Sequence, residues 1–337
     1  MAVKVGRRAA QFLRLAVGVA AIIFMVKMGR INLAALAGTL DRPDLLALAA
    51  FLLLALVPLS AVRWWILLGG LEFKVGFFWT VRVIMITLFF STFLPGAYGG
   101  DVVRVAMAYR KAGRGLSRLT FSVLVDRLCG LVALAAIGIC LLPTLNAGLR
   151  EFDYFVPLAL MIGVILGAGA FGLLLGDRMA ALLARLPKLL WSLHHVFRES
   201  VGALRSYARQ WPRMLALFAL SVLMFIMLLE AIYLLGIAMH FDGLARPAYY
   251  TAGVWAMIAN SLPLTPGGLG VGEAAFAQIA HLLEVVRTHA SYATAFLAMR
   301  VLNVLIGLLG VLPYIASRQQ ILSAVRNVQD DQRPSEP

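Results

Sequence analysis

Seven ionisable side chains lie within or beside otherwise apolar stretches of this 337-residue chain: Asp101, Arg104, Asp126, Arg127, Glu230, Glu273 and Arg300. A charge inside a bilayer is costly, so such residues usually face a protein interior and mark a binding site or a transport route. The four acids and three arginines nearly balance, which makes mutual pairing feasible. Glu230 is the expected protein partner of the arginines, or a proton site if transport is proton-coupled.

Two proline- and glycine-rich stretches accompany these charges, at 91–101 (STFLPGAYGGD) and 260–273 (NSLPLTPGGLGVGE). Proline removes a helical donor and glycine carries a high backbone entropy, so neither stretch can be continuous helix. We expect a short helix after each break, at 102–110 and 274–284, and neither is long enough to cross a bilayer.

The starts of these short helices could bind an anion, because a helix N-terminus offers unpaired N–H groups and positive dipole charge. Arg127 and Arg300 could complete a phosphate site through bidentate guanidinium contacts. Asp101 as an N-cap and Glu273 as a dipole partner could equally serve structure alone. Five glycines would allow close approach of a headgroup to the backbone: Gly99, Gly100, Gly267, Gly268 and Gly270.

The elements that position these residues must lie in a membrane. Hydrophobic residues make up 62% of the chain, charged residues only 14%, and the mean hydropathy is +0.89, well beyond the values typical of soluble domains. Eight apolar runs are present, at about 9–28, 44–68, 77–94, 117–142, 153–175, 212–236, 247–262 and 290–315. The sequence therefore predicts an all-α polytopic membrane protein.

The formal net charge of +14 reflects topology rather than nucleic-acid binding, which we exclude. Most lysines and arginines lie in five segments: 1–14, 63–82, 104–118, 178–213 and 318–333. Placing all five in the cytoplasm satisfies the positive-inside rule. That placement requires 77–110 to enter and return as a re-entrant hairpin, and 247–284 to do so from the opposite side.

The resulting prediction is about six full transmembrane helices plus two oppositely oriented re-entrant helical hairpins, with inverted-repeat character. Such opposed broken helices often mark a transport site near the membrane midplane. The alternative is eight full spans joined by ordinary Pro/Gly loops. Residues 1–320 would form a single transmembrane domain, in which 9–28 is an uncleaved anchor, and 321–337 a cytoplasmic tail, so both termini would be cytoplasmic.

Residues 178–211 are expected to form interfacial amphipathic helices on the cytoplasmic leaflet, although a partner-docking surface is an alternative. Cys129 and Cys140 lie about 16 Å apart on one helix, too far for a disulfide. The chain has no G-x-S-x-G, H-E-x-x-H or P-loop motif, and its five histidines lack metal-ligand spacing. We therefore expect no catalytic residues, metal or cofactor.

Three motifs resemble the lysylphosphatidylglycerol synthase transmembrane region, a flippase-like family. They are FLPGxxGGDxxR at 93–104, SVLxDRLxGL at 122–131 and LPxTPGGLGVxEA at 262–274. Asp126 stands where the family pattern has Glu. Full-length members join this unit to a cytosolic aminoacyltransferase domain, which this sequence lacks, so lysine transfer from tRNA is not expected.

The resemblance implies translocation of a lipid in a bacterial or archaeal cell (inner) membrane, and the candidate phosphate site indicates an anionic headgroup. Phospholipids, glycolipids, polyprenyl-linked lipids and hopanoid-type lipids are the candidate classes. One alternative is a membrane-embedded headgroup transferase with Asp101 or Glu273 as general base. Another is a non-transporting scaffold of a lipid-synthesis or glycosyltransferase complex that docks through 178–213.

Overall fold

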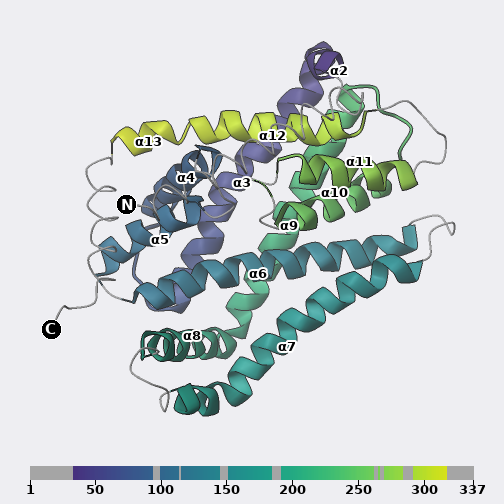
Figure 1. The fold of residues 1–337 in the computed structure, drawn as a ribbon. Coiled ribbons are helices and arrows are strands. Elements are labelled where there is room, and N and C mark those ends of the chain that lie inside the picture. The colour runs from purple at the N-terminus through teal and green to yellow at the C-terminus, as the bar shows by residue number, and fades with distance from the viewer. Residues whose placement is uncertain are drawn as a thin grey trace, which may run out of the picture.

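The computed structural model describes residues 33–93, 99–113, 115–144, 151–183, 191–261, 265, 269–283 and 291–316. These residues form helices joined by short turns, and no strand occurs among them (Figure 1). The α-helices are α2 (Leu33–Gly38), α3 (Pro43–Gly70), α4 (Phe77–Phe93), α5 (Gly99–Ala112), α6 (Leu116–Leu141), α7 (Glu151–Leu183), α8 (Trp191–Arg209), α9 (Trp211–Ala238), α10 (Arg246–Ser261), α11 (Val271–Leu283), α12 (Ala293–Leu308) and α13 (Val311–Ile315).

Five helical segments are long and apolar enough to cross a bilayer: Pro43–Gly70, Leu116–Leu141, Val156–Gly176, Trp211–Ala238 and Ala293–Ile315. They match five of the six expected full spans. The sixth, 9–28, lies outside the described residues. The protein is therefore a multi-pass helical membrane protein, as the composition predicts.

The two expected hairpins correspond to two pairs of shorter helices, α4 with α5 and α10 with α11, and the members of each pair pack together. Helix α5 begins at Gly99, earlier than expected, so Asp101 is the third residue of the helix rather than its N-cap. Helix α11 begins at Val271, which likewise makes Glu273 its third residue.

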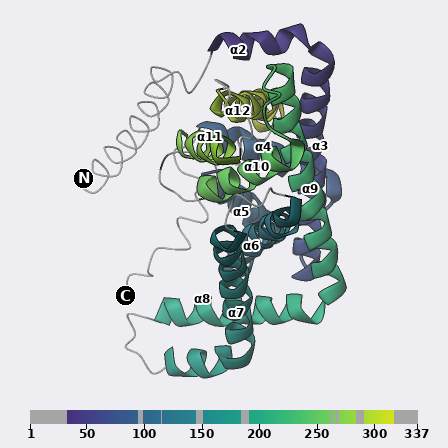
Figure 2. The ribbon, with the colours of Figure 1, turned by 90° about the vertical axis from the view of Figure 1, so that its right-hand side faces the viewer.

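Helices α3 and α9 stand side by side along one side of the molecule (Figure 2). Helices α4, α5, α6, α10, α11 and α12 all lie on the same side of this pair. The two short helices that follow the breaks, α5 and α11, therefore lie on the same side of the α3–α9 pair.

The end of α3 is held by the last turn of α8 and by Gln210, which follows that helix. The Tyr207 hydroxyl donates to the Leu67 carbonyl at 3.1 Å, while Ser206 Oγ and Gln210 Nε2 donate to the Gly70 carbonyl at 2.9 and 3.0 Å. These bonds satisfy carbonyls that a helix end leaves without partners. Within the expected amphipathic segment, residues 178–183 belong to α7, and Trp191–Arg209 form the amphipathic helix α8.

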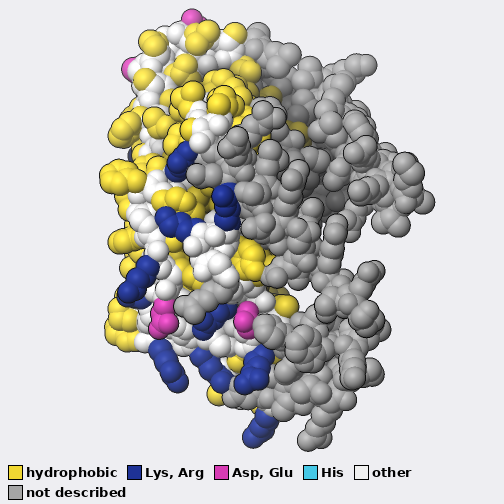
Figure 3. Space-filling model, turned by 90° about the vertical axis from the view of Figure 1, so that its left-hand side faces the viewer, with side chains coloured by type: hydrophobic (Ala, Val, Ile, Leu, Met, Phe, Trp, Pro, Cys, Tyr) yellow, Lys and Arg dark blue, Asp and Glu magenta, His cyan; other side chains and the backbone are white. Residues whose placement is uncertain are grey.

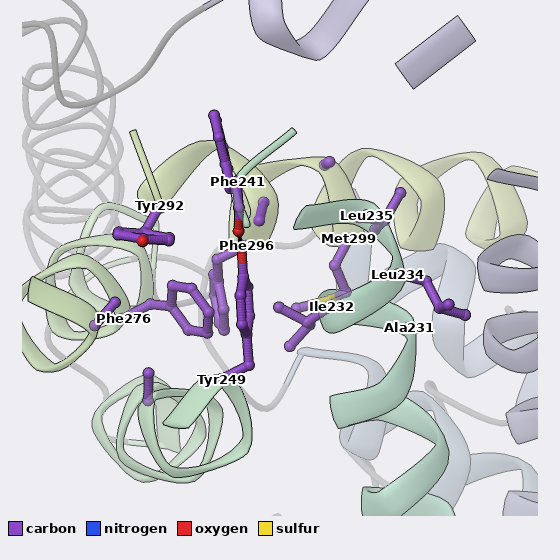
Figure 4. Close-up of a cluster of buried hydrophobic side chains, with 14 of the residues drawn as sticks. Ala231, Ile232, Leu234, Leu235, Phe241, Tyr249, Phe276, Tyr292, Phe296 and Met299 are labelled. Carbon is purple, nitrogen blue, oxygen red and sulfur yellow. Dashed lines mark hydrogen bonds between the residues drawn. The ribbon is translucent and has the colours of Figure 1, made fainter. Parts of the chain in front are cut away.

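Aromatic packing organises the core of the second half (Figure 4). Tyr249 of α10, Phe276 of α11 and Phe296 of α12 are fully buried, as is Tyr292 directly before α12. Ring centroids lie 5.9 Å apart for Tyr249 and Tyr292, and 5.8 Å apart for Phe276 and Phe296. Such edge-to-face and tilted contacts fix α10, α11 and α12 relative to one another.

Candidate functional site

Five charged side chains from α3, α5 and α6 form one network, here called the first charged cluster: Arg63, Asp101, Arg104, Asp126 and Arg127. Asp126 lies at its centre. Its Oδ2 accepts from Arg104 Nη1 at 2.9 Å, and its Oδ1 lies 2.7 Å from Arg63 Nε. Arg63 also donates to Ser221 of α9 at 3.1 Å, so the network reaches the second half of the chain.

Arg127 and Asp101 form the outer part of this cluster. Arg127 Nη2 and Nε donate to Asp101 Oδ2 at 2.7 and 3.1 Å. The Arg127 side chain is 47% exposed, whereas the Arg104 and Asp126 side chains are nearly fully buried. The cluster therefore runs from an accessible pair to a buried one.

The buried part of the cluster has more donors than acceptors. Arg63 and Arg104 share the single carboxylate of Asp126, which leaves one formal positive charge in excess. Arg104 is 4% exposed, and its Nε and Nη2 make no hydrogen bond to any described residue. The same holds for Nε1 of the fully buried Trp64, whose ring lies 4.2 Å from the Arg104 guanidinium carbon.

Gly100 allows α5 to bring these groups together. A Cβ at this position would lie 2.1 Å from Ser91 Oγ and 2.4 Å from the Thr87 carbonyl oxygen, both on α4. Only glycine permits this approach of the two helices, so Gly100 acts here through packing.

Asp126 lies about 15 Å along the axis of α6 from the first residue of that helix. This distance is roughly half the thickness of a bilayer core.

A smaller network, the second charged cluster, consists of Asn260, Glu273 and Arg300. Glu273 is fully buried; its Oε1 lies 2.7 Å from Arg300 Nε, and its Oε2 accepts from the Gly270 N–H at 2.9 Å. Arg300 Nη2 donates to Asn260 Oδ1 at 2.6 Å. Arg300 thereby joins the end of α10 to the start of α11 across the break. Gly270 has a φ of 80°, which favours glycine.

The two clusters repeat one arrangement. In each, an acid at the third position of the helix after the break pairs with an arginine of the next long helix: Asp101 with Arg127, and Glu273 with Arg300. A glycine precedes each acid, and a Cβ on Gly272 would lie 2.7 Å from the Phe296 ring.

Glu230 does not pair with these arginines, and in this respect the expectation from sequence was wrong. Its Oε2 accepts from the Tyr250 hydroxyl, and its Oε1 lies 3.5 Å from Arg246 Nη2 at the start of α10. Arg246 stacks on Tyr233 at 4.7 Å. Glu230 therefore belongs to a separate pair with Arg246, at the start of α10.

The structure thus unites Asp101, Arg104, Asp126 and Arg127, and places Glu273, Arg300 and Gly270 in another network. Gly99 opens α5, while Gly267 and Gly268 lie outside the described residues. Sequence reasoning missed Arg63, although apolar residues on both sides of it were a usable signal. Among the described residues, no group of three His, Cys, Asp or Glu could hold a metal.

Comparison with known proteins agrees with the motifs. A search of curated proteins found no match. The family model for the lysylphosphatidylglycerol synthase TM region matches residues 11–311. That match covers most of the chain, including both helix pairs and both charged clusters. The chain belongs to the family of the lysylphosphatidylglycerol synthase TM region.

Proposed function

We propose that this protein moves a lipid with an anionic, phosphate-bearing headgroup between leaflets, and that the headgroup binds at the first charged cluster. The supporting observation is the excess positive charge there, together with the unaccepted N–H groups of Arg104 and Trp64. Buried donors are normally satisfied, and leaving one unpaired costs about 1–3 kcal/mol or more for a charged group. A phosphate oxygen supplies both the charge and the acceptors that these groups require.

In this proposal α4–α5 and α10–α11 are re-entrant hairpins of opposite orientation, set among six full spans with both termini in the cytoplasm. The side of the molecule at the left of Figure 1, drawn in Figure 3, carries many lysine and arginine side chains. Helix α5 ends toward this side with Arg110 and Lys111. The positive-inside rule identifies such a face with the cytoplasm.

On its way between the leaflets the headgroup would bind near the midplane of the membrane, while the acyl chains stay in the surrounding lipid. Arg127 can exchange Asp101 for the phosphate, because the Arg127 side chain is half exposed. Arg104 lies deeper and would hold the phosphate during passage. The family supplies a lipid context for this assignment, since its name refers to synthesis of an anionic-phospholipid derivative.

The test uses proteoliposomes of neutral carrier lipid with fluorescent phosphatidylglycerol, scored by chemical quenching of the outer leaflet. Arg104→Gln is the informative variant, because it removes the excess charge while Asp126 keeps Arg63 as its partner. We expect at least about a tenfold loss of exchange, the equivalent of 1.4 kcal/mol, with normal thermal stability in detergent. Arg118→Gln, a change of equal charge outside the cluster, is the control.

Two results would contradict the proposal. One is the absence of protein-dependent exchange for every anionic lipid tried. The other is equal exchange of phosphatidylglycerol and an uncharged glycolipid by the wild-type protein, because the site then makes no use of its charge.

A further inference from the structure

Two stacked indole rings with a cation at each end, here called the ladder, lead from the surface to Arg104. The Lys111 ammonium lies 4.7 Å from the centre of the Trp79 ring. Trp79 stacks on Trp64, with centroids 6.2 Å apart and planes 26° apart. The guanidinium carbon of Arg104 lies 4.2 Å from the centre of the Trp64 ring. Three helices contribute to this ladder: α3, α4 and α5.

Burial increases in one direction along the ladder. Lys111 is exposed and Trp79 is partly buried, whereas Trp64 and Arg104 are buried. Lys111 and Arg104 are two turns apart on α5, a rise of about 10 Å. The ladder therefore spans the distance from the end of α5 to the interior of the first charged cluster.

The outer end of the ladder has the composition of a membrane–water boundary. Trp65 and Phe77 pack edge to face at 6.3 Å, and Phe78 beside them is 86% exposed. The Trp65 indole donates to the Val75 carbonyl in the turn between α3 and α4. Tryptophan and other aromatic residues concentrate at the headgroup level of bilayers. Lys111 thus stands where a lipid headgroup resides.

We propose that Lys111 and Trp79 form a loading site that takes the phosphate headgroup of an anionic phospholipid from the leaflet at this face and passes it to Arg104. Lys111 attracts the phosphate, Trp79 holds the ammonium in place, and the unaccepted Trp64 Nε1 and Arg104 groups lie further in. This inference rests on the proposed function, since it supplies the first binding step of that same route.

The experiment measures binding without transport. The full-length protein is placed in nanodiscs of phosphatidylcholine containing a small fraction of phosphatidylglycerol that bears a photoreactive diazirine on its glycerol headgroup. After illumination, labelled peptides are identified by mass spectrometry. We expect labelling of residues near 79 and 111 that unlabelled phosphatidylglycerol competes away and that weakens at high salt, as screening requires.

Three variants sharpen the assignment. Lys111→Gln should lower this labelling by about threefold or more, the effect of losing one exposed cation–π and charge contact. Lys111→Arg should retain it, because a guanidinium also stacks on tryptophan. Lys74→Gln removes an equal charge from the nearby α3–α4 turn and should leave the labelling unchanged.

Equal loss in Lys74→Gln and Lys111→Gln would overturn the loading site, since the effect would then be general surface charge. No labelling near 79 and 111 in the wild-type protein would overturn it as well. Failure of translocation is a separate result: labelling with no lipid exchange refutes transport and keeps the binding site, whereas exchange with no labelling does the reverse.

Discussion

In the α4–α5 pair the acid after the break belongs to a network of five charges, whereas in the α10–α11 pair it meets one arginine amid aromatic rings. Backbone geometry is shared: a break, a glycine, an acid at the third helical position and an arginine from the next long helix. The surroundings differ in charge balance. The second cluster pairs one Glu with one Arg at 2.7 Å, while the first retains a positive excess, and Arg104 and Trp64 there carry donors with no acceptor among the described residues.

This difference indicates that the same arrangement of break, glycine, acid and arginine can either stabilise the fold or bind an anion. Where charges cancel and Asn260 completes the contacts, the arginine joins the two arms of a broken helix. Where charges do not cancel, the same arrangement is ready for an anion. The comparison predicts that removing the surplus cation of the first cluster impairs binding at little cost in stability, whereas variants of the second cluster impair stability, less than additively when both partners change together.

The largest effect is expected from Asp126→Asn. It leaves two buried guanidinium groups facing each other with no shared carboxylate, a loss of about 3–5 kcal/mol for a broken buried pair. Thermal unfolding in detergent, followed by intrinsic fluorescence, should show a large decrease in Tm. Adding Arg104→Gln should recover part of the stability but not lipid exchange. An unchanged Tm in the single variant would mean that Asp126 is not the centre of the network.

A double-mutant cycle on the second cluster gives the next largest effect. Glu273→Gln and Arg300→Gln should each destabilise the protein by about 3 kcal/mol, because each leaves a buried charge unpaired. The double variant should lose about 4 kcal/mol rather than the additive value of about 6 kcal/mol, which is a coupling of about 2 kcal/mol. It should also retain lipid exchange, measured in the proteoliposome assay. Strictly additive losses would show that Glu273 and Arg300 do not stabilise each other, and loss of exchange in a stable double variant would assign this cluster to ligand binding.

A smaller effect separates the two glycines. Gly100→Ala should cost about 2 kcal/mol as an overpacking change, because its Cβ would meet the backbone oxygen of Thr87, which cannot turn away. Gly272→Ala should cost less, since the nearest atoms belong to the Phe296 and Arg300 side chains. Tm values of the two variants test this order. A larger decrease in Tm for Gly272→Ala would contradict this, because it would show that α4 shifts away from a new Cβ more easily than the Phe296 and Arg300 side chains do.

Sequence alone predicted the parts of this site that are local. Long apolar runs, Pro/Gly breaks and charges within apolar segments identified five spans, both short helix pairs and most members of the two clusters. Partners distant along the chain could not be deduced. Arg63 meets Asp126 and Ser221 only because α3 packs against α6 and α9. Glu230 was given the wrong partners for the same reason, since formal charge balance does not say which residues are neighbours.

The hydrogen bonds at the end of α3 also bear on the order in which the chain is made. The Leu67 and Gly70 carbonyls accept from Tyr207, Ser206 and Gln210, residues synthesised about 140 positions later. During synthesis the last turn of α3 therefore lacks these hydrogen-bond partners until residues 206–210, at the end of α8 and directly before α9, have been made. Chains released before that point would lack this closure, so premature termination after α6 should yield a product that membrane proteases remove.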